Sequence, residues 1–139
     1  MSARSVVVTG ASTGIGHATA LRLATEGWQV FAGVRRDVDA DRLRTDARAG
    51  RGELNPLLLD VTDEEQVAAA FTQIAEAVGN RGLSALVNNA GTALGGPVEY
   101  LPLDTWRDQF EVNVFGQIAV TKTAMPLLRR GDDGHPDQD

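Results

Sequence analysis

The chain has 139 residues and no cysteine, which excludes disulfide bonds and thiolate metal sites. Its net charge is −6 without any basic run, and this argues against a nucleic-acid or anionic-membrane partner. Apolar residues make up 42% of the chain, as is ordinary for one globular domain. An apolar run follows the first residues directly, with no signal peptide and no membrane-spanning stretch, so we expect a cytoplasmic protein.

Short apolar runs alternate with helical patterns along the chain. Most of these runs stop at a turn-forming residue after only a few positions, which favours buried strands over helices. The strands are predicted over 5–8, 28–34, 57–59 and 83–87, and the helices over 14–26, 39–49, 62–78 and 105–130, the last with a break near Asn113.

The third predicted helix has the clearest pattern. Thr62 and Glu65 form a candidate capping box at its start, and Gly79 is suited to end it. Its apolar face consists of Val67, Ala70, Phe71, Ile74 and Val78. For the first helix, which Gly27 is suited to end, the expected apolar face is Ile15, Ala18, Leu21, Leu23 and Ala24.

The order βαβαβαβα predicts an α/β protein with a parallel sheet covered by helices on both faces. We assign residues 1–130 to this domain. Residues 131–139 contain four aspartates and no apolar side chain, so we expect a disordered acidic tail there.

A glycine-rich turn, residues 9–16 (TGASTGIG), lies between the first strand and the first helix. Gly10 permits a tight turn, Gly14 leaves room for a pyrophosphate, and Gly16 lets the helix pack on the strand. The amides and dipole of the helix's first turn favour an anion, and Ser12 and Thr13 add hydroxyl donors. An ordinary strand–turn–helix junction also uses glycine, but this context favours a nucleotide phosphate site.

The spacing T-G-x-x-x-G-x-G resembles the cofactor motif of the short-chain dehydrogenases/reductases. Three further motifs follow in the family's order, and the match runs from about residue 6 to residue 130. Asp60-Val61 is similar to the pair that contacts the adenine, and Asn88-Asn89-Ala90-Gly91 to the family's N-N-A-G. Asn113 is similar to the asparagine of the catalytic tetrad.

The resemblance implies a Rossmann-type doubly wound sheet, incomplete here, with about four strands in the order 3-2-1-4. It also implies an oxidoreductase that transfers a hydride between a nicotinamide cofactor and a small carbonyl or alcohol substrate, and a full-length parent that forms homo-oligomers. No metal site is expected. Taken alone, Asp60 could cap a helix, Asn88 and Asn89 could form a turn, and Asn113 could be a satisfied buried amide.

The end of the second strand bears on the choice of cofactor. The family's acidic position, which binds the ribose of NAD, falls on Val34, and Arg35 and Arg36 follow it. We therefore expect NADP(H) to be preferred, with NAD(H) possible and Arg35 as the main determinant. The residues predicted to contact the cofactor are Thr9, Gly10, Ser12, Thr13, Gly14, Ile15, Gly16, Arg35, Arg36, Asp60, Val61, Asn88, Ala90 and Gly91.

The family's serine and Tyr-x-x-x-Lys pattern are not found. Asp104 stands four residues after Tyr100, the only tyrosine, and Lys122 is the only lysine. We therefore expect a fragment that binds cofactor and is inactive alone; the alternatives are a non-catalytic nucleotide-binding module or a non-functional truncated remnant. Without a fifth strand, the fourth should be an exposed edge and the chain only marginally stable.

Overall fold

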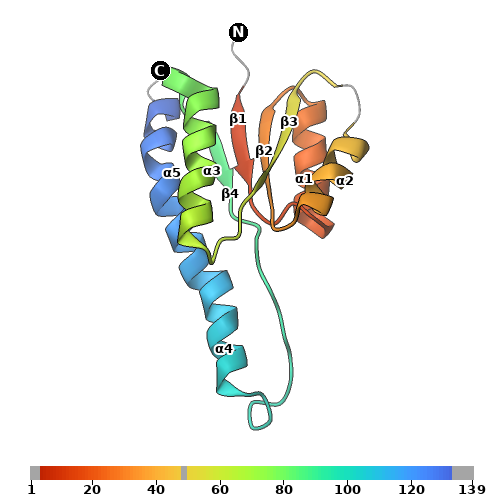
Figure 1. Ribbon diagram of the computed structural model, residues 1–139, viewed down its shortest axis with the longest axis vertical. Coiled ribbons are helices and arrows are strands. Elements are labelled where there is room, and N and C mark those ends of the chain that lie inside the picture. The colour runs from red at the N-terminus through yellow and green to blue at the C-terminus, as the bar shows by residue number, and fades with distance from the viewer. Residues whose placement is uncertain (1–3, 48–49, 133–139) are drawn as a thin grey trace, which may run out of the picture.

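The computed structural model describes residues 4–47 and 50–132. Four parallel strands form one sheet in the order β3-β2-β1-β4, as predicted (Figure 1). The strands are β1 (Ser5–Val8), β2 (Gln29–Val34), β3 (Glu53–Leu58) and β4 (Ala85–Val87). The helices are α1 (Gly14–Thr25), α2 (Asp37–Asp46), α3 (Glu64–Val78), η1 (Gly79–Arg81), α4 (Leu103–Phe110), η2 (Glu111–Gly116) and α5 (Gln117–Asp132).

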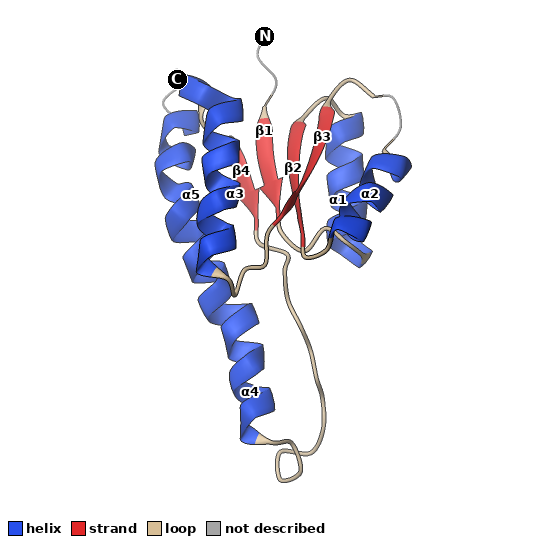
Figure 2. Ribbon diagram, viewed as in Figure 1, coloured by secondary structure: helices blue, strands red, loops and turns tan. Residues whose placement is uncertain are grey.

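Helices cover both faces of the sheet (Figure 2). Because successive side chains of a strand point to opposite faces, Val7 and Phe31 enter the core under α3 and α5. Val6, Val8 and Val30 enter the second core, which also holds buried residues of α1 and α2. The continuous valine run of β1 is thus explained by a strand buried on both sides.

Strand β3 begins four residues earlier than the predicted 57–59 and contains Pro56. A proline cannot donate to a sheet ladder, and its presence made this segment an unpromising strand. It is tolerated because β3 is an edge strand in the described part of the chain, paired with β2 on one side, where Pro56 lies opposite Ala32.

Helix α3 buries the predicted face of Val67, Ala70, Phe71, Ile74 and Val78, and Gly79 ends it with a positive φ of 57°. The predicted capping box at Thr62 is wrong. Asp63 is the N-cap, and its carboxylate accepts from the amides of Glu65 and Gln66. Thr62 cannot take that place because its amide and hydroxyl both bind Asp60.

The face of α1 also differs from expectation. Ile15 is 79% exposed and Ala18 is exposed, whereas Gly16 and Ala20 are the buried residues. The buried residues of α1 are small and lie four positions apart. They are small because α1 packs closely against the end of β1 and the loop after β4. Leu21, Leu23 and Ala24 pack against the core as partly buried residues.

The long helical segment has the break predicted near Asn113. Six residues, Glu111–Gly116, form a π-helical stretch between α4 and α5. Gly116 packs so closely on Val61 that a Cβ there would lie 2.6 Å from a methyl of Val61. The helix continues through Gly131 and Asp132, so the predicted tail begins too early; residues 133–139 lie outside the described residues.

One side of the molecule remains open. As predicted, β4 is an edge of the sheet within the described residues. An apolar row, defined here as Leu103, Trp106, Phe110, Val114 and Ile118, runs along α4, η2 and α5 with each member 36–62% exposed. Exposed apolar side chains at helical spacing are typical of a face that packs against another structure.

Candidate functional site

The glycine-rich turn lies at the carboxyl end of β1, in the centre of the sheet. Gly10 has a φ of 63° and Gly14 of 61°, a region that other residues enter only with strain. A Cβ on Gly10 would lie 2.7 Å from the Cα of Ala90, and one on Gly16 would collide with the Gly10 carbonyl and the Asn89 carboxamide. These two glycines are therefore needed for packing.

Gly14 has a different environment. A Cβ there would meet no atom within 4 Å, so the space beside this residue is open. The N-cap of α1, Thr13, forms no side-chain cap, and no acidic residue stands in the helix's first turn. Open space, uncapped amides and the positive end of a 12-residue helix make a site suited to an anion.

Thr9 connects this turn to the segment after β4. Its buried hydroxyl accepts hydrogen bonds from the amides of Asn89 and Ala90, each at 3.0 Å. The Asn89 carboxamide donates to the Gly10 carbonyl at 3.0 Å. The loops that follow β1 and β4 are therefore joined into one rigid edge, which holds Ala90 and Gly91 beside the turn.

A cleft of about 450 Å³ opens at this edge, beyond the carboxyl ends of the strands. In an open α/β sheet this is where ligands bind. Eight of the predicted cofactor residues line it: Gly10, Ser12, Thr13, Arg35, Asp60, Val61, Ala90 and Gly91.

Two predicted residues lie in a second hollow, of about 390 Å³, outside the cleft. The Asn88 carboxamide donates to the hydroxyl of Thr121 on α5 at 2.9 Å. The Asn113 carboxamide accepts from the Thr92 amide at 2.8 Å and donates to the Thr92 carbonyl at 2.7 Å. In this structure both side chains bind protein groups, and Lys122 lines the same hollow.

Arg35 and Arg36 differ in their contacts. Arg36 binds Asp39, a carboxylate that is 3% exposed, through Nε at 2.9 Å and Nη2 at 3.1 Å. The hydrogen bond from Arg36 lowers the pKa of Asp39, and the same bond raises the pKa of Arg36. Arg35 lines the cleft and makes no side-chain hydrogen bond within the described part of the chain. Of the two arginines, Arg35 is therefore the one that lines the cleft and is not bonded to a neighbouring carboxylate.

Asp60 shapes a turn and also borders the cleft. One carboxylate oxygen accepts from the Thr62 amide at 2.9 Å and from the Thr62 hydroxyl at 2.7 Å, which shapes the turn before α3. The residue also lines the cleft beside Val61. Asp60 does not cap α3, because Asp63 holds that position.

Three residues of the cleft were missed in the sequence, Asp108, Gln109 and Val112, all from the helical segment after the loop that follows β4. Thr92 and Leu94 also line the cleft, and they belong to the 92–102 loop, for which the sequence suggested a role in a substrate wall. These residues belong to no motif, because the loop after β4 runs beyond the sheet and the chain returns through α4, so they come near the earlier motifs only in three dimensions (Figure 1). Asn113 could have indicated this wall, since Val112 precedes it directly.

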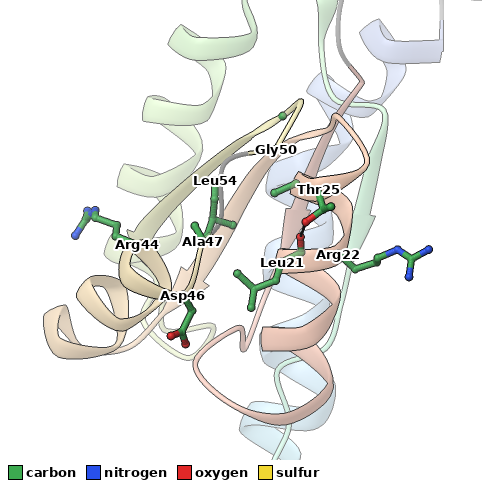
Figure 3. Close-up of a pocket in the computed structure, with 10 residues that line it drawn as sticks. Leu21, Arg22, Thr25, Arg44, Asp46, Ala47, Gly50 and Leu54 are labelled. Carbon is green, nitrogen blue, oxygen red and sulfur yellow. Dashed lines mark hydrogen bonds between the residues drawn. The ribbon is translucent and has the colours of Figure 1, made fainter.

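A larger hollow, of about 530 Å³, lies at the opposite end of the strands (Figure 3). It is lined by the last turns of α1 and α2 and the start of β3, and it contains none of the predicted site residues. Arg22 and Arg44 point outward from it. Residues 48 and 49, which border it in sequence, lie outside the described residues.

Residues 4–47 and 50–132 contain no group of three or more His, Asp or Glu side chains that could hold a metal ion. No helix within these ranges is long and apolar enough to cross a membrane.

The chain resembles known proteins over almost its whole length. The sequence profile of a family described as short chain dehydrogenase matches residues 4–135. An NADPH-dependent 3-dehydrocapnine reductase of Ornithobacterium rhinotracheale is 39% identical over 125 residues, which are 90% of this chain and 43% of that protein.

Solved structures agree with the observed fold. An alcohol dehydrogenase from Thermococcus sibiricus, complexed with 5-hydroxy-NADP, superposes with a TM-score of 0.85 at 27% identity, over 94% of this chain and 55% of that one. The ligand-free aldohexose dehydrogenase of Thermoplasma acidophilum gives 0.75 at 34% identity, over 92% and 45%. The chain spans between a third and a half of the length of its first curated relatives.

Proposed function

Because the chain belongs to the short-chain dehydrogenase family, we propose that it supplies the NADP(H)-binding part of an enzyme that transfers a hydride to or from a carbonyl or alcohol substrate. The observation that carries this proposal is the open space beside Gly14, at the uncapped start of α1, together with a cleft that the preceding Ser12 and Thr13 line along with Arg35. A pyrophosphate and a ribose phosphate are the two anionic groups of NADP, and each has a matching donor here.

Different residues of the chain bind different parts of the cofactor. Gly14 and the first amides of α1 receive the pyrophosphate, with the Ser12 and Thr13 hydroxyls beside it. Arg35 binds the 2′-phosphate, and Asp60 and Val61 border the adenine. Thr9 and Asn89 act indirectly, because they hold the turn and the Ala90–Gly91 wall together.

When bound, the nicotinamide supplies the hydride or accepts it. The side chains of this sequence do not include a Tyr-x-x-x-Lys pair to move the accompanying proton. Tyr100 is 77% exposed in the loop before α4, and Lys122, on α5, lines the same hollow as Asn113. We therefore assign this chain cofactor binding without turnover of its own.

Equilibrium titrations of the folded chain with NADPH and NADH, followed by nicotinamide fluorescence, test the proposal. We expect NADPH to bind at least about tenfold more tightly, since one charge-assisted contact to a phosphate contributes about 1.5–3 kcal/mol. Equal affinities would reject the preference for NADP(H), and binding of neither cofactor would reject the dinucleotide site. Carbonyl reduction by the pure chain would contradict its assignment as non-catalytic.

A further inference from the structure

Two carboxamides on one face of the α4–η2 segment hold the loop that follows β4. The Gln109 carboxamide accepts from the Leu94 amide at 3.2 Å and donates to the Leu94 carbonyl at 3.1 Å. One turn further along, Asn113 makes the same pair of bonds with Thr92. Each carboxamide thus forms one accepting and one donating hydrogen bond with the backbone of a single residue, as a neighbouring β-strand would.

The spacing explains why two such pairs occur together. Gln109 and Asn113 are four residues apart, a rise of about 6 Å along a helix. Thr92 and Leu94 are two residues apart, about 6.6 Å along an extended chain. The two distances match, so an extended segment can run beside this helical face with both carboxamides bonded.

Burial does little to hold this segment, because residues 91–100 are all exposed. Leu94 is 57% exposed, and Gly95, which follows it, has no atom within 4 Å of where a Cβ would stand. The bonds to Gln109 are therefore the main restraint on the position of Leu94. Asn113 cannot replace them, since its two bonds end at Thr92.

We propose that Gln109 is a positioning residue of the cofactor cleft, which holds Leu94 as an apolar wall against the adenine end of the bound dinucleotide. This inference rests on the proposed function. Leu94 and Gln109 line the same cleft as Asp60 and Val61, which follow β3, and Val112 adds a second apolar side chain. A wall of Leu94, Val61 and Val112 suits a flat base better than a phosphate.

The test compares Gln109→Ala with the wild-type chain in binding to NADPH and to 2′,5′-ADP, which contains the adenosine and both its phosphates but no nicotinamide. We expect the variant to lose about tenfold in affinity for both ligands, because Leu94 contacts the part they share. Gln73→Ala, an exposed glutamine on α3, is the matched control and should change neither affinity.

Hydrogen exchange in the free chain provides a second readout that a general loss of stability would not imitate. In Gln109→Ala the amide of Leu94 should exchange at least about tenfold faster, while that of Thr92, held by Asn113, stays protected. Equal exchange at Leu94 in both proteins would overturn the proposal, as would a loss of affinity confined to NADPH.

Failure of this inference can be separated from failure of the proposed function. If the wild-type chain binds neither NADPH nor 2′,5′-ADP, the proposed function fails. If it binds both, and Gln109→Ala binds both with unchanged affinity, only the role of Gln109 is overturned.

Discussion

The guanidinium of Arg36 binds both carboxylate oxygens of Asp39, at 2.9 and 3.1 Å. This pair separates two adjacent arginines that look equivalent in the sequence. Arg36 is held at the start of α2 by a buried carboxylate, whereas Arg35 lines the cleft. The selectivity for the adenosine phosphate should therefore depend on Arg35 alone.

Replacing Arg35 by alanine should lower the affinity for NADPH by about tenfold to a hundredfold, because one charge-assisted contact to the phosphate is lost. The affinity for NADH, which has no such phosphate, should change less than about threefold. Arg44→Ala is the control, since Arg44 lies at the far end of α2 and pairs with Asp41. Fluorescence titration measures the affinities of the wild type and of both variants for NADPH and NADH. An equal loss of affinity for both cofactors in Arg35→Ala would remove Arg35 from its assigned role.

The Arg36–Asp39 pair also predicts a pH dependence of stability. The hydrogen bond from Arg36 lowers the pKa of Asp39 in the folded chain, so the unfolded state binds the proton more readily. The stabilisation is therefore fully present above the unfolded pKa of about 3.9 and is lost as the pH falls through the folded value. Asp39→Asn should be less stable than the wild type at pH 7.

Urea denaturation at a series of pH values tests whether the stabilisation by Asp39 is lost as the pH falls. The difference in unfolding free energy between the wild type and Asp39→Asn should be constant from about pH 7 to pH 5 and should shrink below about pH 4. A difference that persists unchanged at pH 3 would mean that packing, and not the charge of Asp39, stabilises α2.

Alanine substitutions at Gly14 and Gly16 should have different effects, the first mainly on cofactor binding and the second mainly on the stability of the fold. At Gly14 an alanine meets no protein atom, so Gly14→Ala should cost only about 1–2 kcal/mol for its left-handed backbone. Its methyl nevertheless fills the space assigned to the pyrophosphate, and we expect NADPH affinity to fall more than about tenfold. Thermal unfolding together with titration measures the two effects.

Gly16→Ala provides the contrast, because its methyl collides with the Gly10 carbonyl and the Asn89 carboxamide. Overpacking of this kind costs about 1–3 kcal/mol, so the main effect should be on the melting temperature. If Gly14→Ala bound NADPH as tightly as the wild type, the pyrophosphate would have to lie elsewhere.

The sheet and its order could be predicted because local signals coincide with the fold. The valines of β1 are buried on both faces, and the glycines of the turn meet the backbone of the neighbouring loop or face open space. A short buried strand, a glycine turn and a helix are each specified by a few neighbouring residues. They can therefore be recognised in the sequence without knowledge of distant contacts.

One error is local and the others depend on distant residues. Thr62 was expected to cap α3, but its amide and hydroxyl bind Asp60, two residues earlier. Ile15 matches an apolar helix face, yet it projects into solvent because small residues pack that helix. Gln109 belongs to no motif, since its partner, Leu94, lies 15 residues earlier in a loop without a pattern of its own. Pairings of this kind depend on tertiary geometry.

Thr9 provides the last prediction, because one hydroxyl joins the ends of β1 and β4. Thr9→Val keeps the shape of the side chain but leaves the part-buried amides of Asn89 and Ala90 without their acceptor, each at a cost toward the lower end of the range for a buried unsatisfied donor, about 1–3 kcal/mol. We therefore expect about 2 kcal/mol or more of lost stability in urea unfolding, and weaker NADPH binding because Ala90 lines the cleft.

Thr9→Ser is the matched control, since it retains the hydroxyl and removes one methyl group, for about 1 kcal/mol or less. The serine variant should therefore bind NADPH nearly as the wild type does. If the valine variant were as stable as the serine variant, the two amides would have other partners, and the cleft wall at Ala90 would be held by the strands alone. Restored binding in serine but not in valine would instead identify the hydroxyl as the link between the glycine-rich turn and that wall.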